Sequence, residues 1–156
     1  MRLQIVAVGR LRPGPEMSLV AEYLQRAERT GRPLGITQVS VAEVDERKGG
    51  GKAGEAALIR KALPRGARLV AMDERGKTLD SPRFAKRIAD WRDTGSQSLA
   101  FVIGGADGLD PGLVAEADFA LSFGPMVWPH MLARVMLAEQ IYRATSILAG
   151  APYHRV

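Results

Sequence analysis

Short apolar segments rich in β-branched residues alternate along the chain with segments of helical periodicity. The apolar segments fall at residues 3–9, 36–44, 68–73, 98–105 and 118–123. Several are continuous rather than alternating, which is typical of strands buried on both faces. The segments of helical periodicity fall at 16–30, 53–63, 82–93, 111–117 and 129–149. This alternation predicts one α/β domain over residues 1–156, with a parallel sheet covered by helices on both faces.

Turn and capping residues support these boundaries and mark one flexible segment. Asp80 or Ser81 can cap the third predicted helix, and Pro129 can open the last one. The charged, glycine-rich segment 45–55, "DERKGGGKAGE", lies between a predicted strand and a predicted helix. Its composition predicts a mobile connection.

Two loops after predicted strands are candidate ligand sites, because ligands of open parallel sheets bind at the carboxyl ends of the strands. The loop 103–110, "IGGADGLD", contains glycines that let backbone approach a ligand, although they equally suit two tight turns. In 123–128, "FGPMVW", proline restricts the backbone among apolar side chains. This segment can form a wall against a flat heterocycle, or it can simply fill the core.

The last predicted helix carries apolar residues on more than one face. Either it lies inside a larger core, or a second copy of the chain covers it in a homodimer. His130 and Arg134 form a polar pair one turn apart, whereas Glu139 and Arg143 have the spacing of a helix-stabilising salt bridge.

The segment "APYHRV" (151–156) combines three chemically useful side chains. Tyr153 supplies an aromatic ring, His154 supplies an imidazole of the kind used for proton transfer, and Arg155 can bind phosphate. Such a group suits contact with RNA or proton transfer.

Composition excludes several classes of chemistry. The chain has no cysteine and only two histidines, which argues against disulfides, structural zinc and a catalytic metal. Neither a membrane-spanning segment of about 18 apolar residues nor a signal peptide is recognisable, so we expect a cytoplasmic protein. A net charge of +5 weakly favours a polyanionic partner.

Taken together, "LQIVAVGRL", "FVIGGADGL", "LSFGPMVWPHMLARVMLAEQIYRA" and "PYHR" resemble the RlmH family of the SPOUT methyltransferase superfamily over the whole chain. The resemblance implies a homodimer that uses S-adenosylmethionine to methylate N3 of a pseudouridine in helix 69 of 23S ribosomal RNA. Assembled ribosomes would be the substrate. It also implies an α/β trefoil knot in the C-terminal half, which the element pattern alone does not predict.

The resemblance also assigns site residues by position. The implied cofactor-binding residues are Met72, Gly104, Phe123, Gly124, Pro125, Met126, Val127 and Trp128. The residues implied near the methyl-transfer site are His130, Arg134, Tyr142, Tyr153, His154 and Arg155, with the C-terminal residues reaching the partner protomer's site. No metal is implied.

Methylation of N3 requires loss of its imide proton. A neutral His154 is one candidate acceptor, with Arg134 or Arg155 stabilising the resulting anion, and solvent is the other. Two further functions stay open at this point. One is a SPOUT enzyme with another target such as transfer RNA, and the other is a non-catalytic RNA-binding protein that keeps the fold.

Overall fold

The computed structural model describes residues 1–48 and 50–155, and five parallel strands of this part of the chain form one sheet. The strands are β1 (Arg2–Val8), β2 (Gln38–Val44), β3 (Arg68–Thr78), β4 (Ser98–Ile103) and β5 (Phe119–Ser122). Their order across the sheet is β2-β1-β4-β3-β5. The parallel sheet that the apolar segments predicted is therefore confirmed.

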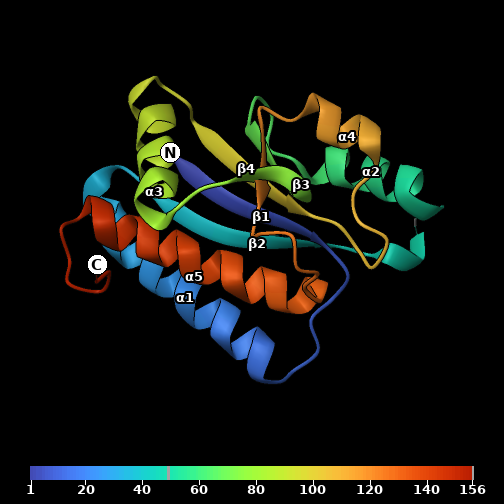
Figure 1. Ribbon diagram of the computed structural model, residues 1–156, viewed down its shortest axis with the longest axis horizontal. Coiled ribbons are helices and arrows are strands. Elements are labelled where there is room, and N and C mark those ends of the chain that lie inside the picture. The colour runs from blue at the N-terminus through green and yellow to red at the C-terminus, as the bar shows by residue number, and fades with distance from the viewer. Residues whose placement is uncertain (49, 156) are drawn as a thin grey trace.

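Helices connect the strands and cover both faces of the sheet (Figure 1). They are α1 (Pro15–Gly31), α2 (Gly51–Ala62), α3 (Ser81–Asp93), α4 (Pro111–Glu116) and α5 (His130–Leu148), with short 3-10 helices η1 (Arg32–Leu34) and η2 (Glu46–Lys48). On one face, α1, α3 and α5 pack against side chains such as Phe101 of β4. On the other face, α2 and α4 pack against its neighbour Val102. Consecutive residues of a buried strand thus serve opposite faces, as the continuous apolar run predicted.

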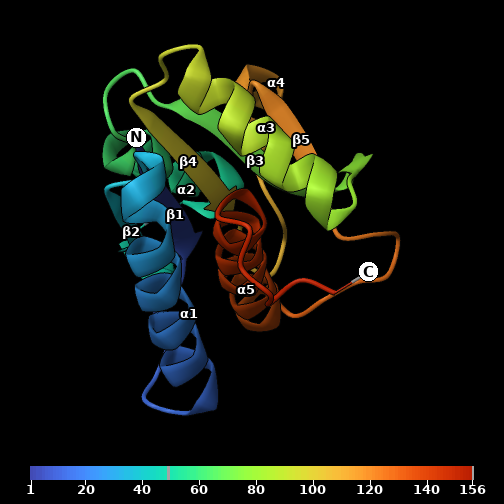
Figure 2. The same cartoon turned by 90° about the vertical axis from the view of Figure 1, so that its left-hand side faces the viewer.

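The larger core, the first of the two explanations offered for the apolar faces of α5, accounts for the middle of this helix. Leu137, Ala138 and Ile141 are fully buried between the sheet and the neighbouring helices. Near the start of α5, Met131 and Leu132 are exposed. Figure 2 shows α5 running beside α1 along one side of the sheet. The larger core thus accounts for the middle of the helix, and its first turns leave an apolar surface.

Strand β3 extends beyond the predicted segment 68–73, because it continues to Thr78. Met72 and Lys77 both lie opposite Leu121 of β5, so the intervening residues 73–76 form a bulge. The charged sequence "DERGKT" carries no apolar alternation that would indicate a strand. Backbone pairing with β5 extends the strand instead.

The predicted mobile connection at 45–55 is largely helical where the structure describes it. Residues 46–48 form η2, and α2 begins at Gly51, while Gly49 lies outside the described residues. Ala56 and Ile59 of α2 are buried against the sheet. This packing outweighs the low helix propensity of the glycines.

Side-chain caps fix the starts of two helices. Asp80, rather than Ser81, caps α3, because its carboxylate accepts a hydrogen bond of 2.8 Å from the backbone N–H of Arg83. Asp110 caps α4 in the same way. Within the described ranges, every helix is too short or too polar to cross a bilayer. The trefoil knot stays a prediction.

Candidate functional site

A cavity of about 490 Å³ lies at the carboxyl ends of β3, β4 and β5. It gathers residues that are far apart in the sequence: all but one of the predicted cofactor-binding residues line it. These are Met72, Gly104, Phe123, Gly124, Met126, Val127 and Trp128. Pro125 belongs to the same segment but does not line the cavity. Apart from Pro125, the predicted cofactor-binding residues therefore line one cavity.

The glycine-rich loop after β4 folds tightly on itself. Gly105 and Gly108 form an isolated antiparallel bridge, and Gly108 has a positive φ of 80°. A Cβ atom at Gly104 would lie 2.6 Å from the carbonyl carbon of Gly108 and 2.9 Å from the amide nitrogen of Leu109. Gly104 is therefore required by the loop's own backbone, in line with the tight-turn explanation that the sequence left open beside the approach of a ligand.

Residues 125–128 of the segment 123–128 lie on the surface, whereas Phe123 packs against the core. Val127 is 83% exposed and Met126 is 71% exposed, so core filling does not explain these two side chains. The segment is anchored at its start, where the backbone N–H of Gly124 donates to the Ser122 hydroxyl at 3.0 Å. Gly124 also has a φ of +106°, a conformation that other residues rarely adopt. The segment is thus shaped as an exposed wall beside the cavity.

The bulge in β3 adds charged groups that the sequence argument missed. Asp73 accepts hydrogen bonds from the backbone and side chain of Arg75, and both residues line the cavity. Hydrogen bonding from the Arg75 side chain is the main cause that lowers the pKa of the Asp73 carboxyl. Asp73 therefore stays ionised at neutral pH. The only sequence signal was a charged run directly after an apolar strand.

His130 lines this cavity, but its predicted companion Arg134 points into the fold. The Arg134 side chain is only 1% exposed. Its Nη1 donates to Oε2 of Glu43 at 2.8 Å, and its Nη2 donates to the carbonyl of Gly9 at 3.0 Å. The same carboxylate oxygen accepts the backbone N–H of Leu11 at 2.7 Å. This arrangement ties α5 to the ends of β1 and β2.

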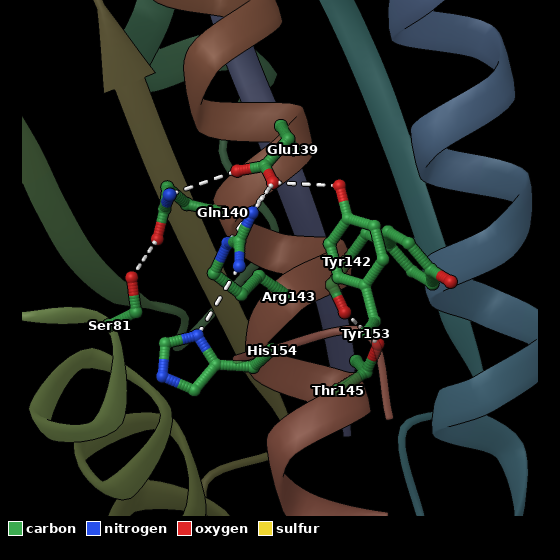
Figure 3. A network of polar contacts seen from close by, with 8 residues as sticks. All are labelled: Ser81, Glu139, Gln140, Tyr142, Arg143, Thr145, Tyr153 and His154. Carbon is green, nitrogen blue, oxygen red and sulfur yellow. Dashed lines mark hydrogen bonds and ion pairs between the residues drawn. The ribbon is translucent and has the colours of Figure 1, made fainter. Parts of the chain in front are cut away.

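The C-terminal residues fold back onto α5 of the same chain (Figure 3). The Tyr153 ring packs on the Tyr142 ring at a centroid distance of 4.4 Å, and its hydroxyl donates to Glu139 at 2.9 Å. His154 contacts Arg143. Glu139 and Arg143 were expected only to stabilise the helix, yet they hold the C-terminal residues in place. Burial is the main cause that raises the pKa of the Tyr153 hydroxyl, which keeps it protonated.

A second, larger cavity of about 820 Å³ adjoins the first. Phe123 and Gly124 line both cavities, so this segment separates them. Glu139 and His154 line the larger cavity, whereas Arg155 is exposed to solvent. The predicted methyl-transfer residues therefore do not share one cavity. They divide into His130 at the first cavity, His154 at the second, the packed pair Tyr142 and Tyr153, exposed Arg155 and buried Arg134. Among residues 1–48 and 50–155, metal-binding side chains form no cluster of three or more.

The family comparison matches this chain over residues 1–154 to the model described as predicted SPOUT methyltransferase. The chain belongs to the SPOUT methyltransferase family. Membership in this family implies that the chain binds a methyl donor. The resemblance stated from the sequence motifs is confirmed at the level of the family.

Two relatives are similar in sequence to this chain over its full length. A protein of Ruegeria pomeroyi is 67% identical over 156 residues, all of both chains. One of Dinoroseobacter shibae is 65% identical over the same span, and both are named ribosomal RNA large subunit methyltransferase H.

Two solved structures have the same fold at low sequence identity. A probable methylase family protein from Haemophilus influenzae has a TM-score of 0.51 and 13% identity, covering 99% of this chain and 70% of that one. A probable methyltransferase from Bordetella pertussis has a TM-score of 0.53 and 14% identity, covering 92% and 95%. At these identities the likeness supports the fold alone.

Proposed function

We propose that this chain uses S-adenosylmethionine to methylate N3 of a pseudouridine in helix 69 of 23S ribosomal RNA, with the assembled ribosome as substrate. The observation that carries the proposal is the 490 Å³ cavity, where segments from three strand ends meet in a chain of the SPOUT family. The printed names of the Ruegeria and Dinoroseobacter relatives support a large-subunit RNA target.

The cavity suits the proposed cofactor in both size and lining. Met72, Phe123 and Trp128 offer apolar surface to an adenine ring and the carbon chain of the methionine part, while the glycine-rich backbone offers polar groups. Asp73 adds a carboxylate that stays ionised, which can attract the cofactor's positive charges. When bound, S-adenosylmethionine supplies an electrophilic methyl group.

The chain's own residues must align the target base and exclude water. Such positioning can contribute about 7–11 kcal/mol to a methyl transfer. His154 lines the larger cavity, which shares Phe123 and Gly124 with the proposed cofactor cavity. A pyrimidine ring of the RNA held in the larger cavity would therefore lie next to the cofactor. Exposed Arg155 is available to contact phosphate. The imide proton of N3 leaves to His154 or to solvent.

Transfer of a labelled methyl group tests the proposal directly. Ribosomes, isolated large subunits, free 23S RNA and transfer RNA, all lacking the modification, are incubated with the protein and labelled S-adenosylmethionine. We expect label in helix 69 of whole ribosomes. Label only in transfer RNA would instead support a SPOUT enzyme with another target, and tight RNA binding without label would support a non-catalytic protein.

Deleting residues 153–156 should lower single-turnover methylation by roughly 100-fold while cofactor affinity stays nearly unchanged. The deletion removes His154 and Arg155 but leaves the 490 Å³ cavity intact. It also removes the packing of Tyr153 on Tyr142, which is worth about 1 kcal/mol and thus roughly 2–4 °C in melting temperature. Calorimetric titration and thermal melting check these expectations. A truncated protein with normal turnover would exclude the C-terminal residues from catalysis.

The homodimer also belongs to the proposal. Exposed apolar side chains lie on the neighbouring helices α1 and α5: Met17 and Leu19 on α1, and Met131 and Leu132 on α5. Trp128, just before α5, is also partly exposed. A second copy of the chain would cover this surface by a two-fold arrangement.

A charge in this surface should separate the two copies. Leu132→Glu would bury an unpartnered carboxylate, so we expect the dimer dissociation constant to rise roughly 100-fold or more. Ala57→Glu, at an exposed position of α2 on the opposite face, is the matched control. Sedimentation equilibrium measures both variants. A wild-type monomer at micromolar concentration, or an unaffected Leu132→Glu dimer, would refute this interface.

A further inference from the structure

The contact between Arg143 and His154 determines which imidazole nitrogen carries the proton. Nη1 of Arg143 lies 3.3 Å from Nδ1 of His154. Arginine can only donate hydrogen bonds, so Nδ1 must accept. In a neutral imidazole the remaining proton then resides on Nε2. The arginine thus fixes His154 as the Nε2–H tautomer.

Arg143 is held firmly enough to impose this choice. Its Nε and Nη2 donate to Oε1 of Glu139 at 3.1 and 2.6 Å, which leaves Nη1 directed at His154 (Figure 3). The Tyr153 ring lies 4.7 Å below the guanidinium carbon. Hydrogen bonding to Glu139 is the main cause that raises the pKa of Arg143. The guanidinium therefore remains charged and oriented.

The other carboxylate oxygen of Glu139 extends the network to α3. It accepts the side-chain amide of Gln140 at 2.9 Å, and Gln140 in turn accepts the Ser81 hydroxyl at 2.7 Å. These residues line the 820 Å³ cavity together with His154. In Figure 3, Nε2 of His154 points away from Arg143, on the side of the ring opposite Tyr153. The free N–H of the ring is thus available to a molecule in this cavity.

We propose that His154 acts in methyl transfer as a hydrogen-bond donor through Nε2–H, and that Glu139 and Arg143 are its positioning residues. This inference rests on the proposed function. To act as a general base, His154 would need an unprotonated ring nitrogen without another partner. Its Nδ1 instead accepts a hydrogen bond from Arg143, and its Nε2 already carries the proton. An N–H donor instead stabilises negative charge on a carbonyl oxygen of the target base.

Methylation of N3 requires no general base from the protein. The imide proton of N3 leaves to water, and the resulting charge spreads over the two adjacent carbonyl oxygens of the pyrimidine. Nε2–H of His154 donates to one of these oxygens. The N3 lone pair then forms the bond to the methyl carbon, and the electron pair of the broken carbon–sulfur bond stays on sulfur.

Nitrogen NMR of the imidazole tests the tautomer without any RNA. The chain has only His130 and His154, so spectra of wild-type protein and His130→Gln assign both rings. At mildly alkaline pH we expect a protonated Nε2 and an unprotonated Nδ1 for His154. Arg143→Met should yield a mixture of tautomers. A protonated Nδ1 in the wild type, or a spectrum unchanged by Arg143→Met, would overturn the proposal.

Single-turnover methylation separates donor from base. Glutamine keeps an N–H donor but accepts no proton near neutrality, whereas phenylalanine has neither property. We expect His154→Gln to retain methylation within about tenfold of the wild type and His154→Phe to lose roughly 10- to 100-fold more. Equal losses in both variants would overturn the donor role. A wild-type protein that methylates no ribosome refutes the proposed function, and the spectra decide the tautomer in either case.

Discussion

We expect Arg134→Met to lower the melting temperature of the protein by roughly 6–12 °C. The guanidinium is buried and pairs with Glu43 at 2.8 Å, so methionine would leave that carboxylate without its cation. The carbonyls of Val8 and Gly9 would also lose a donor. Breaking such a pair costs about 3 kcal/mol or more, which corresponds to this shift in a domain of this size.

The control for Arg134→Met is the same substitution at an exposed helical arginine. Arg29→Met in α1 should change the melting temperature by less than about 2 °C. Thermal melting is combined with methylation by the folded fraction of each variant. If Arg134→Met melts like the wild type but has lost methylation, Arg134 acts on the substrate and its structural role is refuted. The expected loss of stability would instead assign it to holding α5 against β1 and β2.

The strands and helices were predictable where the buried side chains produce a regular pattern of apolar residues in the sequence. Strand β4 is buried along its whole length, so its continuous apolar run identified it directly. Residues 74–78 of β3 were missed because backbone pairing at Lys77 and Thr78, rather than apolar side chains, keeps the end of the strand in the sheet. The helix predicted at 53–63 begins earlier, at Gly51, because burial of Ala56 and Ile59 in α2 outweighs the local glycine content.

Much of the 490 Å³ cavity was predictable because the loops 103–110 and 123–128, whose residues form a large part of its lining, have unusual composition, whereas Asp73 and Arg75 lie outside these loops. The network around His154 was only partly predictable. The spacing of Glu139 and Arg143 indicates a helical ion pair, but it does not reveal that residues 153 and 154 return over the same helix. Glu43, 91 residues from Arg134, illustrates the same limit. Partners brought together by the fold leave no local pattern in the sequence.

We expect Gly104→Val to weaken cofactor binding by roughly 10- to 100-fold. The first added carbon would lie 2.6–2.9 Å from backbone atoms of Gly108 and Leu109, so the loop that lines the cavity must move. Overpacking of this kind costs about 1–3 kcal/mol. If the cofactor binds only to the native loop conformation, the free energy of binding becomes less favourable by the same amount. Calorimetric titration with S-adenosylmethionine measures the loss, and thermal melting reports whether the rest of the fold is retained.

Gly105→Ala is the matched control in the same loop. Its added carbon would meet only side chains, with Cγ1 of Val8 at 3.3 Å and the Glu55 carboxylate at 3.6 Å, so small adjustments suffice. We therefore expect cofactor affinity within about threefold of the wild type, because a small adjustment costs well under 1 kcal/mol. Unchanged affinity in Gly104→Val would show that binding does not depend on this loop. Equal losses in both variants would show that contact with the ligand, rather than the close approach of Gly104 to Gly108, requires glycine here.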